Sequence, residues 1–118
     1  MSYDICLKNP KTGKPIQFEE RHQLKGGTYE AGGSHEAWLN VTYNYSEHLS
    51  RVLEEKGIRV LYGKTGKDSV PILKKAISKM KGVPDRDYWA ATEGNAKKAL
   101  QNLLALAKMA PQGVWDGD

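Results

Sequence analysis

The chain has 118 residues, of which 39% are hydrophobic, and a formal net charge of +4, so it predicts one globular domain over residues 1–118 and excludes a disordered chain. Its single cysteine excludes an internal disulfide, and its positive charge is too small to mark a nucleic-acid binder by itself. No apolar run approaches the ~20 residues that cross a bilayer and no secretion signal opens the chain, so we expect a cytoplasmic protein.

The first 20 residues predict a β-hairpin. Residues 3–8 alternate between apolar and polar side chains, which is typical of a half-buried strand, and Ile16 and Phe18 repeat the alternation. Between these segments, residues 9–13 contain the proline and the glycine that favour a tight turn.

The middle of the chain is expected to run from a loop through a strand and a short helix to another strand. Residues 21–35 are too rich in glycine for a helix or a regular strand, and long loops of this kind often carry function. Residues 37–44 alternate as a strand does, and a helix is expected to start at Ser46 and stop at Gly57. Residues 58–62 are rich in β-formers, so a parallel crossover unit and an antiparallel arrangement are both open.

Two longer helices are predicted in the C-terminal half. Asp68 or Ser69 caps the first of them, which ends by Gly82. Thr92 opens the other and longest helix, whose apolar stripe stops before Pro111, and a short acidic tail follows. The elements together predict an α+β fold, in which a small, mostly antiparallel sheet of three to four short strands packs against two to three helices.

No catalytic or metal-binding motif is found in the sequence. Gly63-Lys64-Thr65 follows an expected strand, but the phosphate-loop pattern requires a glycine at position 58, where the chain has Ile58. The histidines lack the spacing of metal ligands, and no serine or cysteine has a recognisable base. We therefore expect no metal and no cofactor, and we favour a protein that is not an enzyme.

Although the segment is not a phosphate loop, the start of the second helix could still bind an anion in a simpler way. Backbone amides there, with Lys64 and Lys67 beside them, could hold a negative group. An ordinary turn with solvated lysines explains the same residues.

Two groups of residues are less easily explained by packing. The polar side of the strand over residues 37–44 would lie beside Arg59 if the two strands pair, although any sheet with one wet face shows such a pattern. Gly94 and Asn95 are poor helix formers in a first turn, which indicates a close approach by backbone or by ligand. The residues predicted to bind a ligand are Asn40, Thr42, Arg59, Lys64, Trp89, Thr92 and Asn95.

Several segments resemble a family of small uncharacterised proteins encoded by bacteriophages and prophages. They include Gly26-Gly27-Thr28-Tyr29, the segment from Ala37 to Tyr45, Asp87-Tyr88-Trp89, the segment from Thr92 to Ala96, and Gly113-Val114-Trp115. The resemblance spans nearly the whole chain and brings no established activity. It implies a phage accessory protein made in the cytoplasm of the bacterial host.

Two functional hypotheses follow. The first is a non-enzymatic intracellular binding protein, whose partner is a small anionic ligand such as a nucleotide, or a host defence or regulatory protein. The second is a nucleic-acid-binding module that uses the lysine-rich helices, with Arg59, Tyr62, Trp89 and Trp115 as neighbours. A homo-oligomer is compatible with either, since several aromatic residues are available to share between copies.

Overall fold

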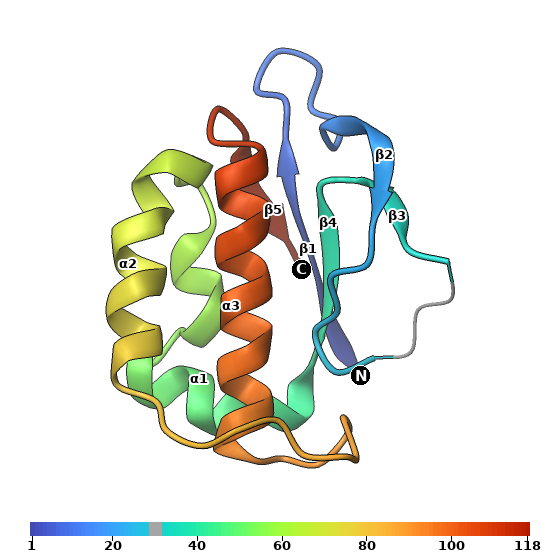
Figure 1. Ribbon diagram of the computed structural model, residues 1–118. Coiled ribbons are helices and arrows are strands. Elements are labelled where there is room, and N and C mark those ends of the chain that lie inside the picture. Colours follow the sequence, from blue (N-terminus) through green and yellow to red (C-terminus); the bar gives the residue numbers. More distant parts are fainter. Residues whose placement is uncertain (29–31) are drawn as a thin grey trace.

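Three helices pack beside a three-stranded antiparallel sheet, and a two-stranded sheet extends from one edge (Figure 1). The computed structural model describes residues 1–28 and 32–118. Its strands are β1 (Ser2–Lys8), β2 (Gln17–His22), β3 (Ser34–Glu36), β4 (Trp38–Thr42) and β5 (Val114–Gly117). Its helices are α1 (Ser46–Val52), α2 (Gly66–Ser78) and α3 (Glu93–Met109), with 3-10 helices η1 (Tyr43–Tyr45) and η2 (Gly57–Leu61). The predicted α+β class is confirmed.

The main sheet has the order β4-β1-β5, with β1 in the middle and both pairings antiparallel. Ile5 at the centre of β1 is opposite Leu39 on one side and Gly117 on the other. The alternation in the sequence decides which side chains face the helices, because neighbouring residues of a strand point to opposite faces. The buried side chains of β1 and β4 are Tyr3, Ile5, Leu7, Leu39 and Val41.

Helix α3 is the main support of the sheet, as the sequence predicted. It lies beside the sheet, and α2 runs antiparallel to it on its other side (Figure 1). Thr92 caps α3 by accepting a hydrogen bond from the amide of Asn95 at 3.1 Å. Ala96, Leu100 and Leu103 of its apolar stripe are fully buried. Within residues 1–28 and 32–118, none of the helices is both long and apolar enough to span a membrane.

The predicted hairpin over the first 20 residues is wrong beyond its turn. The chain does reverse after β1, since the amide of Asn9 donates to the carbonyl oxygen of Lys14 at 2.8 Å. However, β1 pairs with β4 and β5, whereas β2 pairs with β3. Both edges of β1 are occupied by other strands, so the returning segment leaves the main sheet soon after Ile16.

The predicted strand over residues 58–62 is also wrong, because this segment forms the 3-10 helix η2. Ile58 and Leu61 are both fully buried. They lie three residues apart, which is one turn of a 3-10 helix and would put them on opposite faces of a strand. No crossover unit is therefore formed here.

The acidic tail contains a strand, β5, that the sequence reading missed. Trp115 in its middle is only 1% exposed, and its indole nitrogen donates to the hydroxyl of Ser69 on α2 at 2.8 Å. Lys8 on β1 and Asp116 on β5 form an ion pair at 2.7 Å across the other face of the sheet. The tail therefore links the sheet to α2.

Candidate functional site

The connection between α2 and α3 is an exposed loop held in one shape by buried polar groups. Residues 81–89 are all exposed, so they add little to the core. Asn95, which is 4% exposed, lies beneath them. Its side-chain amide donates to the carbonyl oxygens of Asp87 (2.9 Å) and Ala90 (3.0 Å) and accepts from the amide of Asp85 (2.8 Å). One side chain thus fixes three points of the loop.

Residues that follow β4 hold the same loop from the other side. Asn44 donates to the carbonyl oxygen of Trp89 at 2.8 Å, and the ring nitrogen Nε2 of His48 donates to that of Ala91 at 3.0 Å. The hydroxyl of Tyr45 donates to the carbonyl oxygen of Tyr88. Burial raises the pKa of Tyr45, so its hydroxyl keeps the proton that this bond requires.

The unusual residues at the start of α3 meet backbone and not an open space. A Cβ at Gly94 would overlap the main-chain oxygen of Val83. A close approach to Gly94 and Asn95 was expected from either backbone or ligand, and the structure shows that backbone makes it. The consequence is a rigid entry to α3, with a concave surface beside it.

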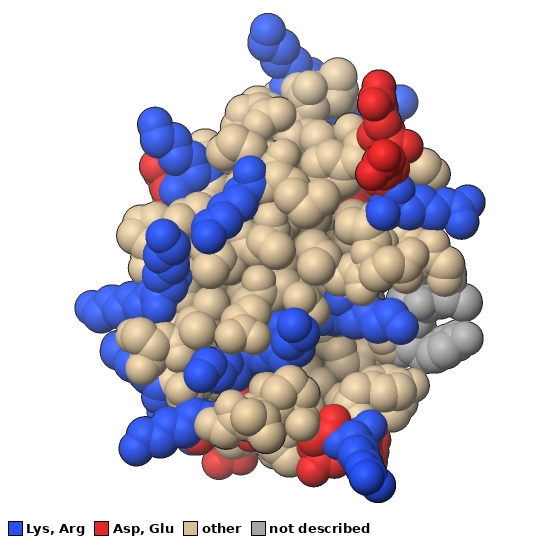
Figure 2. Space-filling view, viewed as in Figure 1, with Lys and Arg blue, Asp and Glu red and all other residues tan. Residues whose placement is uncertain are grey.

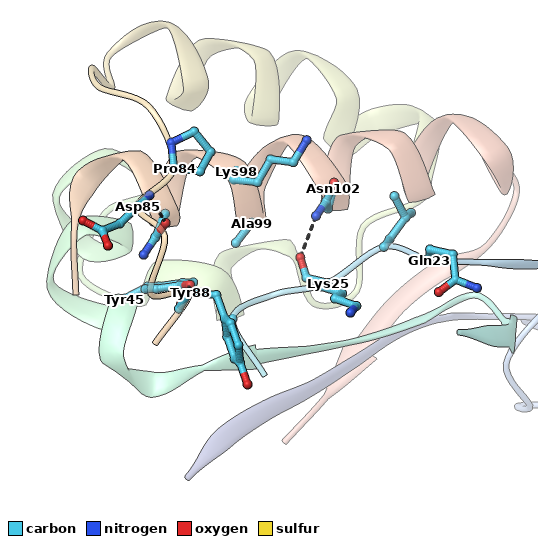
Figure 3. A pocket seen from close by; sticks show the side chains of 12 residues that line it. Gln23, Lys25, Tyr45, Pro84, Asp85, Tyr88, Lys98, Ala99 and Asn102 are labelled. Atoms are coloured by element: carbon cyan, nitrogen blue, oxygen red, sulfur yellow. Dashed lines mark hydrogen bonds between the residues drawn. The ribbon is translucent and has the colours of Figure 1, made fainter. Parts of the chain in front are cut away.

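This concave surface is a cleft of about 400 Å³ between the segment after β2, the loop over residues 82–91 and one side of α3. Its lining is mixed, with polar side chains over a partly apolar floor (Figure 3). The residues that line it are Gln23, Leu24, Lys25, Gly27, Tyr45, Pro84, Asp85, Tyr88, Asn95, Lys98, Ala99 and Asn102. A smaller hollow of about 110 Å³ adjoins it, lined by Lys25, Gly27, Thr28 and Tyr88.

The polar groups of the cleft are arranged unevenly. Figure 3 shows Asp85 and Pro84 towards one end, with Lys25, Asn102 and Gln23 towards the other. Asn102 on α3 donates to the carbonyl oxygen of Lys25 at 2.6 Å, which ties this end of the cleft to the helix. Lysine and amide side chains therefore line one side of the cleft, and a carboxylate lies towards the other.

The glycine-rich loop and the start of α3 share this cleft. Gly27 lines it together with Asn95 and Tyr88. A side chain at Gly27 would overlap the ring of Tyr45 and the methyl group of Thr42, so only glycine lets the loop approach so closely. Tyr29, in the same glycine-rich segment, lies outside the described residues.

The structure does not bring the predicted ligand-binding residues together in one concavity. Asn95 lines the cleft, and Trp89 and Thr92 belong to the same loop and helix cap. Asn40 is bound to Asp4 on the sheet at 2.8 Å, while Arg59 donates to the main-chain oxygen of Asp118 at 2.8 Å. Thr42 is buried as the cap of η1, and Lys64 lines a different cleft.

The expected polar strand face is shorter than the alternation predicted. Trp38 and Asn40 both donate to the carboxylate of Asp4, at 3.3 and 2.8 Å. Their polar groups therefore already have a hydrogen-bond partner on the neighbouring strand. The strand ends at Thr42, because its hydroxyl accepts from the amide of Asn44 and starts η1. Asn44 then turns towards the loop, as described above.

The start of α2 does not offer free amides to an anion. Thr65, and neither Asp68 nor Ser69, caps the helix by accepting from the amide of Asp68 at 3.1 Å. The amides of Gly66 and Lys67 donate to the carbonyl oxygens of Gly113 (2.8 Å) and Pro111 (2.9 Å). Because the chain itself occupies these donors, the structure favours the ordinary turn with solvated lysines over the alternative of an anion site beside Lys64 and Lys67.

Within the described parts of the chain, no cluster of three or more His, Cys, Asp or Glu residues is placed to hold a metal ion. The sequence reading missed Lys25, Tyr88, Lys98 and Asn102 as lining residues of the cleft. One signal was available: Asn95 and Asn102 are seven residues apart on one apolar helix, which places both on its inner side.

Comparison with known proteins gives no relative. No protein-family model matches the chain. No curated protein and no solved structure matches it either.

Proposed function

We propose that the protein is a non-enzymatic binding protein whose cleft beside the start of α3 takes a small anionic ligand such as a nucleotide. The observation that carries this proposal is that Lys25 and Lys98, from separate segments, line one cleft that has Asp85 towards one end. Following the resemblance to phage proteins, we place this activity in the cytoplasm of an infected bacterium.

The size and lining of the cleft favour a ligand with a ring and an acid group. A volume of about 400 Å³ is in the range of small-molecule sites. Tyr88 is 42% exposed at the cleft, so part of its ring is free to stack on a planar base. The ammonium group of Lys98 would meet a phosphate, and Asp85 would accept from an exocyclic amine.

The fixed shape of the cleft also supports binding. The loop over residues 82–91 is tied to Asn95, Asn44, Tyr45 and His48, so its wall is formed before a ligand arrives. A preformed wall lowers the entropy cost of binding. This explains why the chain uses buried polar groups to hold a loop that contributes little to the core.

The test is calorimetric titration with nucleoside monophosphates and cyclic nucleotides. We expect Lys98→Ala to weaken binding by about tenfold to a hundredfold, because it removes a charge-assisted hydrogen bond. Lys108→Ala is the matched control, since it removes the same charge from an exposed position of α3 that does not line the cleft. Its affinity should stay within about twofold of the unaltered protein.

Two results would count against the small ligand. If no nucleotide binds, the protein-partner form of the hypothesis takes its place, with a host defence or regulatory protein as the partner. If Lys98→Ala and Lys108→Ala weaken binding equally, the ligand responds to net charge and not to the cleft.

A further inference from the structure

The outer surface of α2 and α3 is strongly basic. The two helices themselves contain two carboxylates, Asp68 and Glu93, each in the first turn of its helix. Glu54 lines a cleft with Lys75 and Lys79, and Asp85 lines another with Lys98. Figure 2 shows lysine and arginine atoms across the face that these helices form, with the acidic atoms towards its ends. We call this the lysine surface; its residues are Lys67, Lys74, Lys75, Lys79, Lys81, Lys97, Lys98 and Lys108.

The residues of the lysine surface form no ion pair with another described residue of the chain. In residues 1–28 and 32–118 the ion pairs are Lys8–Asp116 and Arg51–Glu93, and neither includes a residue of this surface. Glu93 also accepts from the backbone amide of Lys81 at 2.9 Å, so its carboxylate is already occupied. Solvated helix faces ordinarily mix both signs, and lysines four residues apart, such as Lys75 and Lys79, repel each other.

The large apolar side chain that these helices expose is that of Met109, near the end of α3, which is 45% exposed. Leu73 on α2 and Leu100, Leu103 and Leu106 on α3 are fully buried in the core. A helix that lies in a membrane interface needs an apolar face free to insert beside its basic one. The lysine surface is therefore suited to a polyanion that stays in water.

We infer that the lysine surface binds the phosphate backbone of double-stranded nucleic acid without reading its sequence. Neither α2 nor α3 contains an aromatic residue, and the exposed aromatic side chains Tyr88 and Trp89 lie in the loop at one end of the lysine surface. The surface therefore lacks a row of stacking groups along which a single strand could lie. Trp115, expected earlier as an aromatic neighbour, is buried. With 13 residues, α2 is about 20 Å long, which matches roughly six phosphates along one strand.

The experiment measures the affinity for a short DNA duplex by fluorescence anisotropy over a series of salt concentrations. The test variant is Lys74→Ala with Lys97→Ala, which leaves the cleft unchanged because neither residue lines it. The control is Lys11→Ala with Lys14→Ala, which removes the same charge from the exposed turn after β1. Circular dichroism confirms that both variants remain folded.

We expect the test variant to bind the duplex about tenfold more weakly and to lower the steepness of the salt dependence by about two. The control should keep the affinity and salt dependence of the unaltered protein. Absence of duplex binding at low salt, or equal losses in the two variants, would overturn the inference. Tighter binding to a single strand, or equal binding to phosphatidylserine vesicles, would overturn it as well.

Discussion

The main-chain oxygen of Val83 lies so close to Gly94 that a side chain at Gly94 would overlap it. This approach connects the end of the α2 segment to the first turn of α3. It places the loop over residues 82–91 against the helix, and the cleft lies under that loop. A glycine that looks like a weak point in the helix is therefore required by the loop.

Gly94→Ala should destabilise the protein by about 1–3 kcal/mol, because the added methyl group has to displace backbone. At an open helical position the same change would raise the free energy of unfolding by up to about 1 kcal/mol. Urea unfolding therefore tests this contact by whether Gly94→Ala lowers or raises the free energy of unfolding. A stabilised Gly94→Ala variant would mean that Val83 does not lie against the helix.

Two substitutions of Asn95 separate its roles. Asn95→Ala should cost about 1–3 kcal/mol, since it leaves the amide of Asp85 and the carbonyls of Asp87 and Ala90 without their partner. Asn95→Asp keeps an acceptor for the amide of Asp85 but places a carboxylate against the two carbonyls. Site-resolved hydrogen exchange should show protection of the Asp85 amide in Asn95→Asp and its loss in Asn95→Ala.

Ser69→Ala tests the link between β5 and α2. The hydroxyl of Ser69 accepts from the indole nitrogen of Trp115, and both side chains are buried. Its removal leaves that N–H group without a partner and should lower the free energy of unfolding by about 1–3 kcal/mol. Ser78→Ala, on an exposed position of the same helix, is the control and should have little effect.

The contribution of Glu93 to the free energy of unfolding should depend on pH. The backbone amide of Lys81 and, more weakly, the nearby Arg51 hold the pKa of the Glu93 carboxyl below its ordinary value of 4.5. A depressed pKa in the folded state adds stability above the unfolded pKa and loses it as the pH falls through the folded one. Glu93→Gln should therefore lower the free energy of unfolding at pH 7. The difference in this free energy between the variant and the unaltered protein should shrink below about pH 4.5. A difference independent of pH would contradict this role.

The sequence predicted those elements whose residue pattern follows from the burial of one face of a single strand or helix. The alternation of β1 and β4, the Thr92 cap and the stripe of α3 follow from local burial on one face, and all are found. The segment over residues 58–62 misled because β-branched residues suit strands, whereas burial of Ile58 and Leu61 on one side required a tighter turn. Pairing partners could not be predicted, since β5 lies more than 100 residues from β1.

The candidate site was predictable only in part. Asn95 and the glycines beside the cleft stood out because they break local rules for helices and strands. Lys25 and Lys98 gave no such signal, because an exposed lysine has the same local pattern whether or not it lines a cleft. Asn40 and Arg59 were predicted to bind a ligand, but their side chains form hydrogen bonds within the protein, to Asp4 and Asp118.

The most direct test of the proposed function is nuclear magnetic resonance of the ¹⁵N-labelled protein during titration with nucleoside monophosphates and cyclic nucleotides. A ligand in the cleft should shift the amide signals of Gly27, Tyr88, Asn95 and Lys98 in a saturable way, while those of Lys11 and Arg59 stay in place. Saturable shifts confined to residues outside the cleft, or none with any nucleotide, would contradict the account.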